Sequence, residues 1–170
     1  MTHILDKLDA EALYRTLLQK ITVALPQTAS LQLAGIRSGG AWIAERMARD
    51  LHLPHPPGFI DVSFYRDDYA QKGLHAAVQP TSIPFDVDKA TILLIDDVLY
   101  TGRTTRAAIN ELFDYGRPDK IMLAALIDRG GRELPVSADF VSLSVFVPQD
   151  QTLVLHRTDE NLFDMTVEHA

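Results

Sequence analysis

Two apolar runs separated by a helical pattern constrain the fold of this chain more than any other feature. Ile92–Ile95 and Ile121–Ile127 contain no polar side chain. Between them, Thr104–Tyr115 has helical spacing and is followed by Gly116 and Pro118, which end helices. Strands that are apolar on both faces are covered on both faces, as in parallel sheets with crossover helices. The pattern therefore predicts an α/β fold with a central, mostly parallel sheet flanked by helices.

The rest of the chain continues this alternation of strands and helices. The tail, Val136–Val167, is predicted to form short strands and turns. The chain has 170 residues, which fits a single domain over 1–170. The other predicted elements are a helix capped by Asp6 or Asp9 and stopped by Pro26, a strand at Leu31–Ile36, a helix at Ala41–Leu51 and a half-buried strand at Phe59–Tyr65.

Composition excludes several classes of function. The chain has no cysteine, so it has no disulfide scaffold, thiolate zinc site or cysteine nucleophile. A net charge of −7 argues against non-specific affinity for nucleic acid, which needs a positive surface. No apolar run approaches the roughly 20 residues of a membrane span, and the first residues lack the apolar segment of a signal peptide. We therefore expect a soluble cytoplasmic protein with no membrane partner.

The residues after the first apolar run have the types that bind a sugar phosphate. Asp96 and Asp97 follow the predicted strand, and a loop to Thr104 then opens a helix. Ligands of open α/β sheets bind outside the carboxyl ends of strands, and amides at a helix start bind phosphate. Paired carboxylates repel phosphate but accept hydrogen bonds from a sugar diol, so a 5-phosphorylated ribose would satisfy both halves. The alternative is a turn whose aspartates only cap the helix.

The whole segment Ile92–Thr104 resembles the motif of type I phosphoribosyltransferases that binds phosphoribosyl pyrophosphate (PRPP). Its second part, Asp96–Thr104, resembles the form found in the PyrR family, whose members are pyrimidine-operon attenuators with uracil phosphoribosyltransferase activity. Outside this motif, five further segments resemble the same family: Gly35–Ser38, Tyr65–Asp68, Gly116–Pro118, Asp128–Gly130 and Arg132–Pro135. The resemblance implies the type I phosphoribosyltransferase fold, with a flexible loop at about 66–84 and a small C-terminal hood within 136–170.

The resemblance also implies a role for each matching segment. Asp96 and Asp97 would hold the ribose hydroxyls and stabilise the positive charge that develops at C1′. Arg66 would begin the loop that closes over the reaction. The 5-phosphate would lie against Val98, Leu99, Tyr100, Thr101, Gly102, Arg103 and Thr104, the pyrophosphate against Arg37, Ser38, Gly39 and Gly40, and uracil against Ile127, Asp128 and Arg129.

Several of these residues have a simpler interpretation. Arg66–Asp68 could be a solvated charge cluster, Arg37 an exposed turn residue, and Asp128 with Arg129 an ion pair at a strand end.

The chain departs from the family pattern in the expected pyrophosphate loop, where many family members have Thr-Arg-Gly and this chain has Ser38-Gly39-Gly40. One arginine is thus missing from the expected pyrophosphate loop, although glycine amides can still bind pyrophosphate.

The resemblance leaves three functions open. The first is Mg²⁺-dependent formation of UMP and pyrophosphate from uracil and PRPP, with Mg²⁺ held mainly by PRPP oxygens near Asp96 and Asp97, in a homodimer or larger homo-oligomer. The second is a UMP-responsive regulator that binds an mRNA leader, and the third is a phosphoribosyltransferase for another base. Basic residues of RNA-binding members are often replaced here, at Gly131, Ser137 and Leu143. We therefore expect weak or absent specific RNA binding, with Arg15, Lys20 and Arg132 as the residues that an oligomer could gather into one basic patch.

Overall fold

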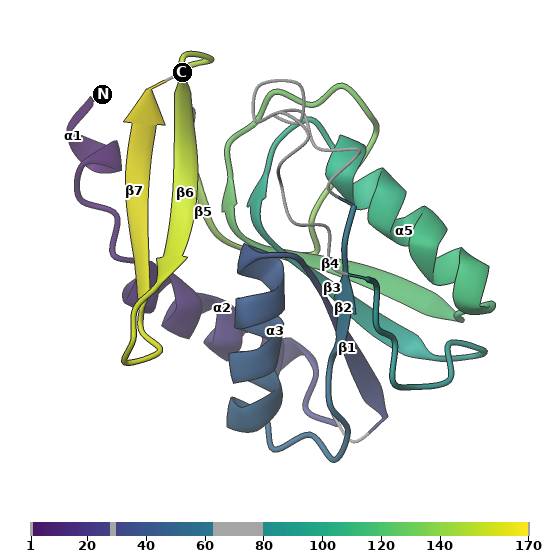
Figure 1. Ribbon diagram of the computed structural model, residues 1–170. Helices are drawn as coiled ribbons and strands as arrows, with labels where there is room; N and C mark the ends of the chain where they lie inside the picture. The colour runs from purple at the N-terminus through teal and green to yellow at the C-terminus, as the bar shows by residue number, and fades with distance from the viewer. Residues whose placement is uncertain (1, 28–29, 63–79, 170) are drawn as a thin grey trace.

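The structure, a computed structural model, describes residues 2–27, 30–62 and 80–169. A five-stranded sheet forms its centre, with the strand order β2-β1-β3-β4-β5 (Figure 1). All neighbouring pairs in this sheet are parallel, which confirms the predicted α/β fold. The strands are β1 (Leu31–Ile36), β2 (Gly58–Ile60), β3 (Thr91–Leu99), β4 (Lys120–Asp128) and β5 (Phe140–Ser144).

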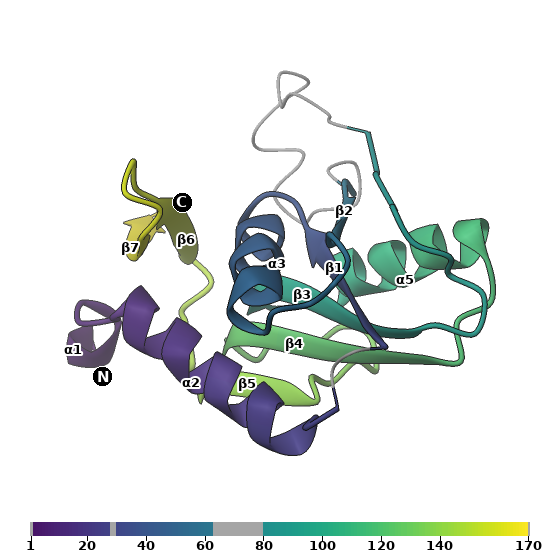
Figure 2. The same cartoon turned by 90° about the horizontal axis from the view of Figure 1, so that it is seen from below.

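Helices cover both faces of this sheet, as Figure 2 shows. On one face, α2 (Ala10–Ala24) and α3 (Gly39–Asp50) pack against alternate residues of β3, such as Leu93 and Ile95. On the other face, α5 (Arg103–Tyr115) covers the residues between them. This double burial explains why the central strands are apolar throughout. A short helix, α1 (Thr2–Leu5), precedes α2, and none of the described helices is long and apolar enough to cross a membrane.

The strand order reverses direction between β1 and β3. From β1 the next strand, β2, lies on one side, whereas β4 and β5 follow β3 on the other. A crevice forms at such a switch point, outside the carboxyl ends of the strands, and is the usual ligand site of open α/β sheets. The chain after β1 and the carboxyl end of β3 therefore face the position where a ligand is expected.

Two of the differences from the predicted element boundaries lie at this switch point. Asp96 and Asp97 were predicted in a turn but belong to β3, because the pairing with β4 continues as far as Leu99 and Asp128. Gly39, predicted in a turn before a helix, is instead the first residue of α3.

The structure also shows which residue caps the first long helix and where the strand predicted at 59–65 ends. Of the two candidate caps of the first long helix, the cap is Asp9, whose Oδ1 accepts a hydrogen bond of 3.0 Å from the Ala12 amide. Within the part of 59–65 that the structure describes, β2 ends at Ile60, and 63–65 lie outside the described residues.

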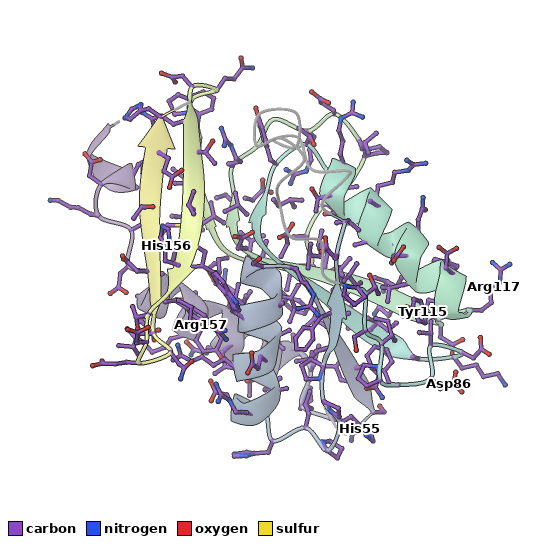
Figure 3. The ribbon with its side chains drawn as sticks, in the orientation of Figure 1. His55, Asp86, Tyr115, Arg117, His156 and Arg157 are labelled. Atoms are coloured by element: carbon purple, nitrogen blue, oxygen red, sulfur yellow. The ribbon has the colours of Figure 1, made fainter. Side chains whose placement is uncertain are left out.

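A hairpin stands apart from the central sheet, on the opposite side of the molecule from α5 (Figure 1). Its antiparallel strands are β6 (Gln151–Arg157) and β7 (Phe163–His169). The segment 136–170, predicted as the hood, thus divides into β5, which belongs to the central sheet, and this hairpin. Arg157, labelled in Figure 3, joins the hairpin to α3 through a 3.1 Å ion pair with Glu45.

A second, less exposed ion pair joins the hairpin to both helices of its face. The guanidinium of Arg46 on α3 donates to both carboxylate oxygens of Glu11 on α2, at 2.6 and 2.9 Å. Glu11 also accepts a 2.7 Å hydrogen bond from the Phe163 amide of β7. The hydrogen bonds from Arg46 lower the pKa of Glu11 below its usual value, although partial burial opposes this effect. Glu11 therefore connects three elements as a charged carboxylate.

Candidate active site

The residues predicted to bind pyrophosphate pack directly against the strand that carries the two aspartates. A Cβ added to Gly39 would overlap the Asp97 carboxylate, with Asp97 Cγ at 2.8 Å. A Cβ added to Gly40 would overlap the carbonyl oxygen of Ile95 and lie 3.0 Å from Asp96 Cα. Glycine at position 40 therefore allows the start of α3 to approach the backbone of β3, and glycine at position 39 leaves room for the Asp97 carboxylate where it lies. This contact brings 37–40 and 96–97 into one site.

The two aspartates differ in exposure. Asp96 is buried, with a relative exposure of 6%, and Asp97 is half-buried. Asp96 Oδ1 accepts a hydrogen bond from the Asp97 amide at 2.9 Å, and Asp97 Oδ1 accepts one from the Val98 amide at 2.8 Å. These bonds to the backbone orient both carboxylates at the carboxyl end of β3. Ionised carboxylates in this position are acceptors for hydroxyl groups of a ligand.

The predicted phosphate loop connects the end of β3 to α5. Gly102, with φ of 92°, occupies the N-cap position of α5. Because it has no side chain, no side-chain hydrogen bond from this position reaches the first amides of the helix. The hydroxyl of Thr101 accepts a hydrogen bond from the Arg103 amide at 3.2 Å. The side chain of Arg103 turns outward and forms a 2.7 Å ion pair with Glu133. A helix start of this kind offers amide groups and a positive dipole to a phosphate.

At the end of β4, Asp128 and Arg129 do not form the ion pair with each other that we considered. Asp128 accepts hydrogen bonds from Arg132 Nη2 at 2.5 Å and from the Gly130 amide at 3.0 Å. Burial alone would raise the pKa of Asp128, but these two hydrogen bonds and the positive charge of Arg132 together lower the pKa below its usual value. Asp128 therefore enters the site as a charged acceptor.

Arg129 is buried, and its guanidinium bonds to the protein itself. Nη1 donates to the carbonyl of Gln151 at 3.0 Å, and Nη2 donates to those of Val147 at 3.2 Å and Pro148 at 2.9 Å. Burial lowers the pKa of Arg129 below its ordinary value, and the guanidinium lies 4.0 Å from the centre of the Tyr100 ring. These contacts assign the side chain to the interior rather than to direct contact with a base.

A pocket of about 370 Å³ opens beside the end of β4. Phe146, which follows β5, has a relative exposure of 73% although it is a large apolar side chain. An exposed aromatic ring in a pocket is suited to stacking on a planar ligand. The residues that line this pocket are Asp128, Arg129, Gly130, Ser144, Val145 and Phe146.

The structure brings most of the predicted site residues to one edge of the sheet, with some differences in what each side chain can contact. Leu99 and Ile127 are buried in the core, so only their backbone can reach a ligand. Arg37 is half-buried, and its guanidinium lies 5.1 Å from the centre of the Phe59 ring, so it is not simply an exposed turn residue. Of the loop predicted at about 66–84, Arg66 and the rest of the part 66–79 lie outside the described residues.

Sequence reasoning missed Ser144 and Phe146. The signal for them is a parallel β5, whose carboxyl end must lie at the same edge as those of β3 and β4. The sequence predicts the tail only as short strands and turns and assigns no pairing partner to any of them. The position of Ser144 and Phe146 beside the end of β4 could therefore not be predicted.

Comparison with known proteins agrees with this geometry. Residues 2–152 match the family model described as phosphoribosyl transferase domain. A protein of Ralstonia nicotianae named bifunctional protein PyrR is 51% identical over 157 residues, which cover 91% of this chain and 90% of that protein. Proteins with the same name from Pseudomonas aeruginosa and Nitrosococcus oceani are 48% and 46% identical, with coverage of 73% of each chain for the first and of 79% and 78% for the second.

Solved structures resemble this fold at low sequence identity. A hypoxanthine-guanine phosphoribosyltransferase from Bacillus anthracis has a TM-score of 0.62 at 15% identity, covering 82% of each chain. A purine phosphoribosyltransferase from Pyrococcus horikoshii has a TM-score of 0.58 at 22% identity, covering 80% of this chain and 81% of the other. These similarities establish the type I phosphoribosyltransferase fold.

Proposed function

The chain belongs to the PyrR family of type I phosphoribosyltransferases, and we propose that it forms UMP from uracil and PRPP. The observation that carries this proposal is the position of Asp96 and Asp97, at the end of β3 and directly before the helix start of α5. Carboxylates for a ribose diol and amides for a 5-phosphate thus lie next to each other. A phosphorylated ribose would use both features, whereas an uncharged sugar would use only the carboxylates.

In the proposed reaction, a ring nitrogen of uracil forms a bond to C1′ of PRPP. The bond from C1′ to the pyrophosphate oxygen breaks, its electron pair leaves with pyrophosphate, and the nitrogen loses its proton to solvent. Positive charge develops on the ribose during this exchange, and the negative carboxylates of Asp96 and Asp97 would stabilise it. Backbone amides near Gly39 and Gly40 would bind the departing pyrophosphate. Arg66 is proposed to begin the loop that closes over the site, on the resemblance alone.

We propose that uracil binds in the pocket beside Asp128. The ring of Phe146 would stack on one face of the base. The charged Asp128 and the backbone around Gly130 would offer polar atoms to its edge, and Arg129 would support this wall from inside the protein. The base site thus differs from the sequence prediction in giving Phe146, rather than Ile127 or the Arg129 side chain, the direct contact.

Magnesium fits the same arrangement. Among the residues that the structure describes, no group of three or more His, Cys, Asp or Glu side chains could hold a metal ion. Mg²⁺ prefers phosphate oxygens and water, so PRPP would provide most of its ligands, with the carboxylates of Asp96 and Asp97 nearby. When bound, it would neutralise charge on the pyrophosphate.

A panel of bases tests this function. Purified protein with PRPP and Mg²⁺ would be offered uracil, orotate, hypoxanthine, guanine and adenine in turn, with pyrophosphate release measured for each. We expect release with uracil above that with every other base. A preference for a purine would retain the reaction class but overturn the proposed base, and no release with any base would overturn the enzyme function.

A second candidate function is a UMP-responsive regulator that binds the leader of a pyrimidine-operon mRNA. The observation that favours it is that the relatives described above are named bifunctional. A homo-oligomer, carried over from the family resemblance, would suit both functions and stays a prediction.

A further inference from the structure

The aromatic ring of Tyr100, in the predicted phosphate loop, forms a cation–π contact with Arg129, in the wall of the base pocket. Its centre is 4.0 Å from the guanidinium carbon of Arg129, which has a relative exposure of 6%. Three residues after the end of β4, Gly131 adopts φ of 75°, and a Cβ there would overlap Tyr100 Cε2. The ring therefore lies against Arg129 and in the space left by the missing side chain of Gly131.

The backbone on either side of this ring bonds to the same neighbouring segment. The carbonyl of Leu99 accepts a hydrogen bond from the Arg129 amide at 3.0 Å. The carbonyl of Tyr100 accepts one from Arg132 Nη1 at 2.7 Å. The carbonyl of Thr101 accepts hydrogen bonds from the amides of Glu133 at 2.9 Å and Leu134 at 3.1 Å. Three consecutive carbonyls of the phosphate loop are thus held by residues 129–134.

Arg129 extends this connection to the far wall of the pocket. Its Nη2 group donates to the carbonyls of Val147 and Pro148, the two residues that follow Phe146. The stacked pair of Tyr100 and Arg129 therefore links the loop proposed for the 5-phosphate to the aromatic wall proposed for the base. Because a buried guanidinium with several acceptors has little freedom to move, the link fixes the distance between the two subsites.

We infer that Tyr100 is a positioning residue, which sets the phosphate loop at the distance from the base pocket that a complete nucleotide requires. This inference rests on the proposed function. The ring itself need not touch a ligand, since it acts through the loop that carries it and through Arg129. Reaction rates depend on such alignment more steeply than the binding of either half of a ligand does.

The test compares a joined ligand with its phosphate half. UMP and ribose 5-phosphate would be titrated by calorimetry into wild type, Tyr100→Leu and Tyr100→Phe. Leucine removes the stacking on Arg129, whereas phenylalanine keeps the ring. We expect Tyr100→Leu to weaken UMP by about tenfold or more and ribose 5-phosphate by less than about twofold, because only the joined ligand needs both subsites in register. Tyr100→Phe should keep the wild-type ratio of the two affinities, because it keeps the ring against Arg129.

Equal weakening of both ligands by Tyr100→Leu, or no weakening of either, would overturn the inference, because the ring would then only support the loop or do nothing. Gly131→Ala adds a methyl group where the ring lies and should weaken UMP selectively too; its titration replaces that of Tyr100→Leu if the leucine variant lacks a cooperative thermal transition. If wild type binds another nucleoside monophosphate in place of UMP, the proposed base fails, and the same comparison with that nucleotide tests Tyr100. Failure of wild type to bind any nucleotide would overturn the proposed function and this inference together.

Discussion

The carboxylate of Asp97 occupies the space that a side chain at Gly39 would need. Asp97 Cγ would lie 2.8 Å from a Cβ at position 39, much closer than carbon atoms approach in proteins. Because position 39 is glycine, the Asp97 carboxylate can lie against the start of α3.

Gly39→Ala should lower kcat by about 10- to 100-fold, because the added methyl group displaces a carboxylate that acts on the ribose, and small misplacements of reacting groups have effects of this size. Steady-state kinetics with uracil and PRPP would measure it. Thermal unfolding would show whether the variant keeps its fold. An unchanged kcat would mean that Asp97 does not act from the position it has in this structure.

Asp96→Asn and Asp97→Asn should each retain the fold and lower kcat by about 10²- to 10³-fold, the usual loss when one preorganised electrostatic contact is removed. Asparagine keeps an oxygen that can accept the backbone hydrogen bonds made by each aspartate. What it removes is the charge that would stabilise the developing cation. The matched control is Asp159→Asn, on the exposed turn of the hairpin, which should have wild-type kinetics.

Phe146→Ala should raise the KM for uracil while leaving the KM for PRPP unchanged. A stacked aromatic contact contributes about 0.5–1.5 kcal/mol, so the expected increase is about 2- to 10-fold. The side chain is exposed, so its truncation should leave the melting temperature unchanged. Phe113→Ala removes another exposed ring, on α5 and outside this pocket, and is the control. An equal increase of both KM values would contradict a base-specific contact.

The parallel sheet could be predicted from the sequence because strands that are buried on both faces are apolar at every position, as at Ile92–Ile95 and Ile121–Ile127. The sequence predicted the neighbourhood of Asp96 for a similar reason, since parallel strands must end at one edge. It could not predict that β3 continues to Leu99, because strand length depends on pairing with β4. Nor could it separate the outward Asp128 from the inward Arg129, since the direction of those side chains depends on Arg132 and on the carbonyls of the distant segment 147–151.

Glu11→Gln should destabilise the protein by about 1–3 kcal/mol at neutral pH, because it leaves the guanidinium of Arg46 without its charged partner. Since the folded state lowers the pKa of Glu11, this stabilisation is fully present above the unfolded pKa of about 4.3 and is lost as pH falls through the folded pKa. Urea unfolding at pH 7 and pH 3 should therefore show a difference between wild type and variant that shrinks in acid.

The control for this experiment is Glu45→Gln, which removes the more exposed ion pair with Arg157. Exposed pairs contribute only about 0–1 kcal/mol, so its effect should be small at both pH values. A pH-independent difference for Glu11→Gln would contradict the assignment of the stabilisation to the charge of Glu11.

Specific binding to RNA should be weak, because the three basic residues that could contact it have partners within the protein; the exposed Arg15 forms a 3.9 Å ion pair with Glu11. Arg132 donates to the carbonyls of Tyr100 and Val136 and to Asp128, and Lys20 Nζ donates to the carbonyl of Val141 at 2.7 Å. Affinity for RNA falls steeply with each phosphate contact that is lost, and a chain with a net charge of −7 has no long-range positive field to compensate.

Filter binding to the leader transcript of the organism's own pyrimidine operon, at near-physiological salt with and without UMP, would measure the affinity for RNA. Nanomolar affinity that UMP strengthens would contradict the prediction and favour the regulator, with subunits of an oligomer gathering Arg15 and its neighbours into one basic surface.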